Sequence, residues 1–558
     1  MFLALLAVVV AAPFERPLLT LPGGFTLTTV EIVLFAALGV IAVKRGPRNL
    51  FSQTTPLWRP GIVLLLVIGA AALVAGVERG NAIRFAGRLA IAAALFVATV
   101  RVIDTAGRAR LVAATMLAVA TVVAGIAVVE AAQVPAIMQL LTLFRPGFHV
   151  VAGQLRATST LFYPTIASMY LEVAFAFGLW LLLDVRARPS WVRPVVFIAL
   201  VIVGAGIAAT FTRAGLIGMG AAMVLVAALG LTRAPLSRAG LGTVTLLAAV
   251  IAIIVFVSHS PEALATRLTT EGSQAWYGAR YEVPTDLSLR TGELQRVPVT
   301  VTNIGRLAWD SQREPRFAMA YHWTRGDGEE VVQFDGARTP FPVVVAPDAT
   351  VSFAADVFAP GEPGVYTLVW DVVHEDRAWL STEGVPPART SVTVTGQPVA
   401  AVVTTMNRLP AAPVVPPRPA LWMAALRIAR DHPWLGVGPD NYRHVYGPYT
   451  GLAQWDHRVH ANNMYLDVLA GAGVPGLLAL VWLVASAFAL LWRRMRAATP
   501  ATHIAAAAAL AMWVMVAGHA LVDSFLSFTT TYVTFAVGLG LACSPGLVAS
   551  EPPDAHRF

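Results

Sequence analysis

The sequence predicts a polytopic α-helical membrane protein that carries an inserted all-β domain. Of its 558 residues, 57% are hydrophobic and only 13% are charged, whereas a soluble domain has about 25% charged residues. Apolar runs long enough to cross a bilayer recur along the chain. One segment of different composition separates the last three runs from the others. These observations exclude a soluble protein of one domain.

Twelve apolar segments are expected to form transmembrane helices. Their ranges are 2–20, 26–43, 60–77, 82–100, 111–132, 161–183, 192–210, 214–231, 239–258, 464–491, 502–521 and 528–546. The first is interrupted by Glu15 and Arg16 and has the length of a signal sequence, but it lacks a basic start and further spans follow. We therefore expect it to be a first helix.

Basic residues predict the orientation of these helices. Lys and Arg concentrate in the loops after the second, fourth, sixth, eighth and tenth spans, and such loops stay in the cytoplasm. Both termini are then cytoplasmic, and the loops 133–160, 211–213, 259–463 and 522–527 are external. The chain would be a multi-pass protein of the inner (plasma) membrane, in contact with membrane lipids.

The charge balance excludes a nucleic-acid partner. Residues 259–400 carry 18 acidic and 11 basic residues, a net charge of −7, and the remainder carries +15. Because the basic excess lies mostly in membrane loops, it accounts for topology rather than for nucleic-acid binding. The lone Cys543 cannot form an intrachain disulfide.

The segment 259–400 predicts an Ig-like antiparallel β-sandwich on the external face. Apolar and polar residues alternate at 296–303, 350–358, 364–373 and 390–396. Trp309, Trp323 and Trp379 could stack on sugars, but a sandwich core also needs such residues. The predicted organisation is helices 1–9 at 1–258, the β insertion at 259–400, a linker and interfacial helix at 401–463, and helices 10–12 with a short tail at 464–558.

The segment 418–442, RPALWMAALRIARDHPWLGVGPDNY, predicts an amphipathic helix followed by a tight turn. Its apolar face would hold Ala420, Leu421, Ala424, Ala425, Leu426 and Ile428. Gly436 and Gly438 would give the turn its backbone freedom. A membrane-surface helix without chemistry fits this segment equally well.

The segment 458–476, RVHANNMYLDVLAGAGVPG, is a candidate reacting end of an active site. His460, Asn462 and Asn463 precede Tyr465 at the external end of a predicted span. Gly473 and Gly476, three residues apart, would allow close helix packing. A polar N-cap is the simpler interpretation, because Asn is a favoured cap.

Three arginines are expected at the same external surface. Arg156 precedes a Ser/Thr-rich entry to a span, Arg213 lies at a helix boundary, and Arg418 opens the amphipathic helix. Their guanidinium groups could bind a diphosphate through paired hydrogen bonds. Snorkelling arginines and hydroxyl caps are the alternative interpretations.

As a set, these motifs resemble the O-antigen ligase and O-antigen polymerase (Wzy-type) superfamily, integral-membrane glycosyltransferases of the GT-C kind. Their pattern is an arginine and a tryptophan, P-x-x-G-x-G, then H-[NSQ], nine residues and G-x-x-G. The matching residues are Arg418, Trp422, Pro433, Gly436, Gly438, Asn463, Gly473 and Gly476. ATFTRAGLIG around Arg213 and RATSTLFYP from Arg156 resemble two further family segments.

The resemblance implies a glycosyltransferase that moves a glycan from an undecaprenyl-diphosphate-linked donor to an acceptor hydroxyl on a glycan, lipid or protein. Arg156, Arg213 and Arg418 would bind the donor diphosphate, and no metal or other cofactor is implied. The family's basic histidine falls on Asn462, because H-A-H-N is replaced here by H-A-N-N. Either His460 takes the role, or Asn462 and Asn463 only position groups, or the chemistry is altered or lost.

Three classes of function therefore remain open from the sequence. The first is an O-antigen ligase, a polymerase or a protein O-oligosaccharyltransferase in surface polysaccharide or glycan synthesis. The second is a binder or transporter of lipid-linked glycans, and the third is a membrane scaffold that carries the β insertion. The insertion itself is either a spacer or a module that meets an acceptor, a glycan or another envelope protein.

Overall fold

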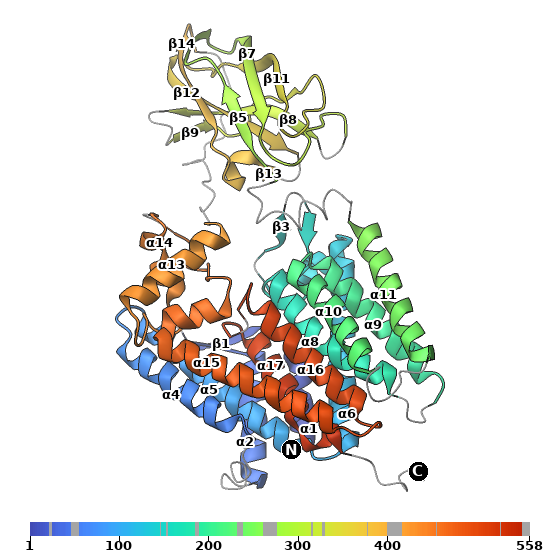
Figure 1. Ribbon diagram of the computed structural model, residues 1–558. Coiled ribbons are helices and arrows are strands. Elements are labelled where there is room, and N and C mark those ends of the chain that lie inside the picture. The colour runs from blue at the N-terminus through green and yellow to red at the C-terminus, as the bar shows by residue number, and fades with distance from the viewer. Residues whose placement is uncertain are drawn as a thin grey trace. The chain divides into compact units, whose positions relative to one another are not determined.

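The computed structural model describes residues 1–21, 25–45, 55–145, 147–151, 154–184, 189–230, 238–259, 276–313, 316–325, 330–375, 378–398, 416–452, 455–524 and 526–549. The chain divides into a helical unit, made of Met1–His149, Leu155–Pro261 and Arg418–Phe558, and a β unit, made of Val150–Gln154 and Glu262–Pro417 (Figure 1). The expected linker at 401–415 and the basic loops at 46–54, 185–188 and 231–237 lie outside the described residues.

The helical unit has a helix in each of the twelve expected ranges. These helices are α1 (Phe2–Ala11), α2 (Thr29–Arg45), α4 (Trp58–Val74), α5 (Arg79–Val102), α6 (Ala106–Ala131), α8 (Pro164–Leu183), α9 (Val192–Ala209), α10 (Arg213–Gly230), α11 (Arg238–Ser258), α15 (Met464–Ala497), α16 (His503–His519) and α17 (Thr529–Cys543). Seven described helices, among them α5, α8 and α15, are long and apolar enough to cross a membrane. The chain is thus built as a polytopic membrane protein, and twelve crossings stay a prediction.

The expected first span is wrong in extent. Helix α1 ends at Ala11, and the chain continues as a hairpin of β1 (Pro17–Leu21) and β2 (Phe25–Thr28). Ten helical residues cover about 15 Å, half of the hydrocarbon thickness. Pro13 has no N–H to continue the helix, and Thr29 Oγ1 donates to the Phe14 carbonyl at 2.7 Å, which fixes the turn.

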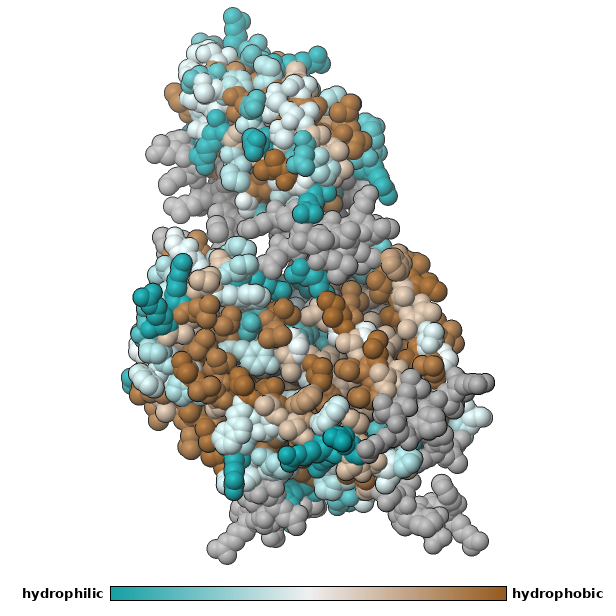
Figure 2. Space-filling view, viewed as in Figure 1, coloured by the Kyte–Doolittle hydropathy of each residue, from teal (hydrophilic) through white to brown (hydrophobic). Residues whose placement is uncertain are grey.

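Helix α8 forms the centre of the helical unit. All of its residues except Thr165 are buried, and it packs against α6, α9, α10 and α16. Helices nearer the surface are apolar on the outside as well: Leu66 of α4 and Phe256 of α11 are 67% and 66% exposed. Figure 2 shows apolar side chains across the visible face of this unit. Such a surface suits contact with lipid rather than water.

Shorter helices connect these elements. They are α7 (Pro135–Leu141), α13 (Arg418–Asp431), α14 (Tyr442–Tyr449) and α18 (Pro545–Val548). A two-stranded sheet of β3 (His149–Val151) and β4 (Gln154–Arg156) leads to Arg156.

The β unit consists of two sheets. Their strands are β5 (Ala279–Glu282), β6 (Asp286–Arg290), β7 (Leu294–Asn303), β8 (Phe317–Arg325), β9 (Glu330–Gln333), β10 (Thr339–Pro340), β11 (Thr350–Phe358), β12 (Gly364–His374), β13 (Ala378–Trp379) and β14 (Ala388–Thr395). One sheet has the order β10-β8-β12-β14-β6, with β9 beside β8 and β13 beside β12, and the other has the order β11-β7-β5. The expected fully antiparallel arrangement is wrong for one pair, because β14 and β6 run parallel. Ig-like topology stays a prediction.

Side chains of β8 connect the two sheets. Trp323 Nε1 donates to the Phe358 carbonyl of β11, and Phe358 N donates to Tyr321 Oη, both at 2.9 Å. Trp309 and Trp323 are fully buried, as the core interpretation expects, so neither offers a face to a sugar. Trp379 is half-buried beneath the Arg338 guanidinium, 4.8 Å from its ring centre.

Candidate functional site

The two halves of the 418–478 motif join at a break in α15. Val437 N and Gly438 N donate to the carbonyls of Ala470 and Gly471, each at 3.0 Å, and Val474 N donates to the Pro433 carbonyl at 2.8 Å. Helix α15 can accept these bonds because Gly473 has non-helical backbone angles, φ 69° and ψ −171°. The P-x-x-G-x-G segment is therefore bonded to the helix like a short strand.

Gly473 has a different role from the one expected, whereas Gly436 and Gly438 have positive φ, as the predicted tight turn requires. A Cβ on Gly473 would come within 2.5 Å of the Pro433 carbonyl, and Gly436 also has positive φ and contacts the backbone of Ala470. The prediction that Gly473 serves helix–helix packing is wrong: it opens α15 to receive the loop. Gly476 lies against Ala472 of its own helix.

Helix α13 holds this junction in place through its apolar face. The buried cluster contains Leu421, Ala424, Ala425 and Ile428 from α13 with Tyr442, Tyr446, Ala461 and Ala470. Leu426, expected on the same face, is instead 46% exposed. Trp422 places its indole Nε1 in a buried position, without a hydrogen-bond partner among the described residues.

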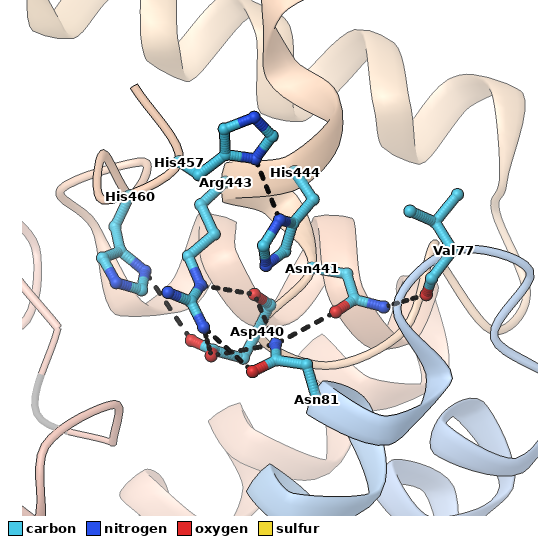
Figure 3. Close-up of polar contacts among 8 residues, drawn as sticks. All are labelled: Val77, Asn81, Asp440, Asn441, Arg443, His444, His457 and His460. Carbon is cyan, nitrogen blue, oxygen red and sulfur yellow. Dashed lines mark hydrogen bonds and ion pairs between the residues drawn. The ribbon is translucent and has the colours of Figure 1, made fainter. Parts of the chain in front are cut away.

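His460 faces a buried carboxylate that the sequence did not single out. Its Nδ1 lies 3.8 Å from Oδ1 of Asp440, and the side chains are 14% and 8% exposed (Figure 3). Asp467, one turn into α15, lies within electrostatic range of both and accepts a bond from Ala461 N at 3.0 Å. A carboxylate beside an imidazole nitrogen can orient the ring and select its tautomer.

A polar network fixes Asp440 in this position. Its Oδ2 accepts bonds from Arg443 Nη2 at 3.0 Å and from Asn81 Nδ2 at 3.1 Å, while Arg443 also donates to Asn81 Oδ1 at 2.9 Å (Figure 3). Oδ1 is buried and has no hydrogen-bond partner among the described residues. The network therefore leaves one oxygen of Asp440 available to the His460 side.

The two asparagines have separate structural roles. Asn463 caps α15, with its side-chain oxygen accepting from Leu466 N at 3.1 Å, as the N-cap alternative expects. Asn462 adopts φ 50°, a left-handed conformation that Asn tolerates better than most residues. The position that the family gives to histidine is thus a turn position here.

Two neighbouring cavities adjoin the start of α15, directly after the His460–Asn463 segment. The smaller one is lined by polar residues, among them Asp440, Asp467, Ser524 and Ser527, together with apolar ones. The larger is apolar and lies between α4, α5, α15, α16 and α17; Met464 and Leu526 line both. Tyr465 also lines the apolar cavity, and its hydroxyl donates to the Ala517 carbonyl at 3.1 Å.

Arg156 connects two of the expected arginine segments. Its Nε donates to the Thr210 carbonyl at 3.1 Å and its Nη2 to Thr212 Oγ1 at 3.2 Å, directly before Arg213 at the start of α10. Ala157 N also donates to the Ala209 carbonyl at 2.9 Å. The structure therefore brings the Arg156 strand and the Arg213 turn together.

A buried ion pair holds the loop that follows Arg156. Glu130 accepts bonds from Thr158 N at 3.1 Å, from Ser159 N at 2.7 Å and from Arg145 Nη2 at 2.5 Å. The side chains of Glu130 and Arg145 are 0% and 1% exposed. This loop is ordered by a glutamate from within α6.

An aromatic row leads from the Arg156 region to His460. The ring centroids of His149 and Tyr163 are 5.0 Å apart, those of Tyr163 and Phe528 5.6 Å, and those of Phe528 and His460 6.2 Å. Burial lowers the pKa of His149, and the charge of Arg156 lowers it further. Burial therefore disfavours the charged form of His149 in this row.

Arg418 is positioned beside a second buried pair. It lies within electrostatic range of His519, whose Nδ1 is 3.0 Å from Glu172 Oε1. Sequence reasoning missed Glu130, Glu172, Asp440, Asp467 and His519. A usable signal existed for all of them except Asp440, since the other four lie within predicted spans, where ionisable residues are rarely without a role.

The described residues hold no cluster of three or more His, Cys, Asp or Glu arranged for a metal ion. Fold and site together indicate an integral-membrane protein in which His460 faces the buried carboxylate of Asp440. Residues 404–481 match the O-antigen ligase family, and this segment includes α13, the glycine junction, His460 and the first half of α15. A comparison with curated proteins found no significant match. The family match supports the expected superfamily. It indicates a role of the glycosyltransferase type in polysaccharide synthesis, with a lipid-linked glycan and an acceptor as general partners.

Proposed function

We propose that the protein transfers a glycan from an undecaprenyl-diphosphate donor to an acceptor hydroxyl, as an O-antigen ligase or polysaccharide polymerase, on the external face of the inner membrane. The observation that supports this most is that the matched segment carries a histidine, His460, facing the buried carboxylate of Asp440. Both termini are cytoplasmic in this proposal, and the β unit is external.

His460 acts as the general base. Because its Nδ1 faces Asp440, the opposite ring nitrogen, Nε2, takes the proton of the acceptor hydroxyl. The imidazolium that forms is stabilised by Asp440 and, at longer range, by Asp467. General-base catalysis of this kind contributes about 10²- to 10⁴-fold in rate.

The leaving group is a lipid diphosphate. The acceptor oxygen forms a bond to the anomeric carbon of the donor sugar while the bond from that carbon to the diphosphate oxygen breaks. Negative charge then builds on the diphosphate, and Arg156, Arg213 and Arg418 stabilise it. In this proposal Asn463 fixes the start of α15 as its cap, and Asn462 keeps the His460 segment in its turn.

The proposal is tested with purified protein and a lipid-linked glycan donor, by measuring formation of the transferred glycan and release of the lipid diphosphate. Arg213→Ala and Arg418→Ala should each reduce transfer at least 10-fold. Arg430→Ala, an exposed arginine of the same helix as Arg418, is the matched control and should retain wild-type transfer. Unchanged transfer in both site variants would show that these arginines do not bind the diphosphate.

A non-catalytic binder of lipid-linked glycans is the second candidate. The observation that favours it is Asn462 at the family's histidine position, in a conformation that serves a turn. A binder would retain the donor without releasing lipid diphosphate, so the same assay separates the two functions. Analysis of the surface polysaccharide after deletion separates the acceptors. Short single-repeat chains indicate a lost polymerase, and long chains left on the carrier indicate a lost ligase.

A further inference from the structure

Glu172 and His519 form a buried ion pair at the centre of the helical unit. His519 Nδ1 lies 3.0 Å and 3.1 Å from the two Glu172 oxygens, and Ser168 Oγ donates to Oε1 at 2.8 Å. Each side chain of the pair is only 1% exposed. Charged groups at such a position within a membrane helix are expensive, and they commonly have a functional role.

Helix α10 is shaped around this pair. A Cβ on Gly215 would contact Ser168 Oγ and come within 3.0 Å of Glu172 Oε1, and a Cβ on Gly218 would come within 3.1 Å of Oε2. Arg213 begins this same helix, two residues before Gly215. The pair therefore fixes how closely the Arg213 end of α10 approaches α8 and α16.

His519 also connects to the other two parts of the candidate site. Arg418 lies within electrostatic range of its ring. The turn that follows His519 supplies the carbonyls of Ala520 and Asp523, which accept Met464 N at 2.9 Å and 3.1 Å. Met464 is the first residue of α15 and directly follows the His460–Asn463 segment.

We propose that Glu172 and His519 are a positioning pair that holds the diphosphate-binding arginines at the correct distance from His460; this rests on the proposed function. Because both side chains are only 1% exposed, we place neither in contact with substrate. Their effect passes through the start of α10, through Arg418 and through the backbone bonds to Met464. Two apolar residues of similar volume would pack at least as stably as a buried ion pair, so stability alone does not account for the charges.

The first test measures kcat and KM for donor and acceptor in Glu172→Gln, His519→Ala and His519→Asn. Asn retains a donor near the position of Nδ1, so His519→Asn should recover most of the transfer that His519→Ala loses. We expect at least a 10-fold fall in kcat for His519→Ala and Glu172→Gln. Glu31→Gln is the matched control, because Glu31 is a buried glutamate of α2 that pairs with Arg88 at 4.0 Å.

A second measurement does not depend on activity. Spin labels at Met423→Cys of α13 and Leu521→Cys of the turn after α16, both at exposed positions, report the distance between these two segments. The distance distribution should broaden or shift in His519→Ala and stay unchanged in Glu31→Gln.

If the wild type transfers glycan, and His519→Ala has the same kcat and the same distance distribution as the wild type, the positioning role is overturned and the proposed function is not. If His519→Ala has a lower unfolding temperature and His519→Asn does not recover transfer, the pair only stabilises the fold. This result would also overturn the positioning role. Absence of transfer and of lipid diphosphate release by the wild type would instead overturn the proposed function. The distance measurement still decides whether the pair holds the two segments.

Discussion

Nδ1 of His460 lies 3.8 Å from Oδ1 of Asp440, an oxygen that is buried and has no hydrogen-bond partner among the described residues. The other oxygen of Asp440 is bonded to Arg443 and Asn81. Oδ2 of Asp440 therefore holds the side chain in place, and Oδ1 faces the imidazole of His460. It is the geometry of a histidine oriented by a carboxylate, assembled from segments that the sequence separates by nineteen residues.

The Asp440 carboxylate should be needed for turnover more than for folding. Asp440→Asn keeps the shape of the side chain but removes the charge that stabilises the His460 imidazolium, so kcat should fall about 10²-fold. Asp431→Asn, at an exposed residue that accepts a bond from Tyr449 Oη, is the control. Equal kcat for the two variants would show that Asp440 does not act on His460.

The glycine junction predicts a large difference between two Gly→Ala substitutions. Gly473→Ala puts a Cβ against the Pro433 carbonyl in a left-handed backbone conformation, and should lower the free energy of unfolding by about 1–3 kcal/mol. Gly220→Ala lies in α10 with nothing within 4 Å of the added Cβ, and should be neutral or stabilising. Thermal unfolding in detergent measures both; a Gly473→Ala variant as stable as Gly220→Ala would mean that the loop does not enter the break in α15.

Much of the fold follows from periodicity and apolar length. The ranges 192–210 and 239–258 coincide with helices to within a few residues, and the alternating segment 350–358 is strand β11. Strand β8 could not be read in this way. It lies inside its sheet with both faces covered, and because Phe317–Thr324 are all buried, apolar and polar residues do not alternate.

The buried pair of Glu130 and Arg145 should show strong coupling. Glu130→Gln leaves the Arg145 charge buried without its anionic partner and replaces one of the two acceptor oxygens with an NH2 donor, so it should cost about 3–5 kcal/mol of unfolding free energy. Arg145→Met added to Glu130→Gln should recover part of that loss, since no lone charge remains. Additive effects of the two substitutions in a double-mutant cycle would contradict the pairing.

His149 predicts that the Arg156 region weakens at acidic pH. Burial lowers the pKa of His149 in the folded protein below its ordinary value of 6.5. The unfolded chain therefore binds more protons as the pH falls below 6.5, and the stability that neutral His149 contributes above that pH is progressively lost. Thermal unfolding at pH 7.5 and 5.5 should differ less in His149→Gln than in the wild type. Identical pH dependence in the two proteins would exclude His149 as its source.

The site residues that belong to a sequence motif could be predicted, and those that reach the site only through tertiary contacts could not. His460, Arg418 and the glycines stand out because their spacing is unusual. Asp440 does not, because a single Asp within GPDNY is an ordinary turn residue until Asn81 of α5, 359 positions away, bonds to it. Long-range pairing of this kind leaves no local pattern in one sequence.

The central claim is that the general base is His460 and that position 462, where the family has its histidine, does not supply it. Glycan transfer should be measured in His460→Ala, in Asn462→His and in the double variant that restores histidine at the family position. His460→Ala should lose at least 10²-fold in kcat, and Asn462→His should stay near wild type. The double variant should remain inactive, because position 462 has a left-handed turn conformation and it is the ring at position 460 that faces Asp440. Wild-type transfer in His460→Ala, or recovery of transfer in the double variant, would contradict this account.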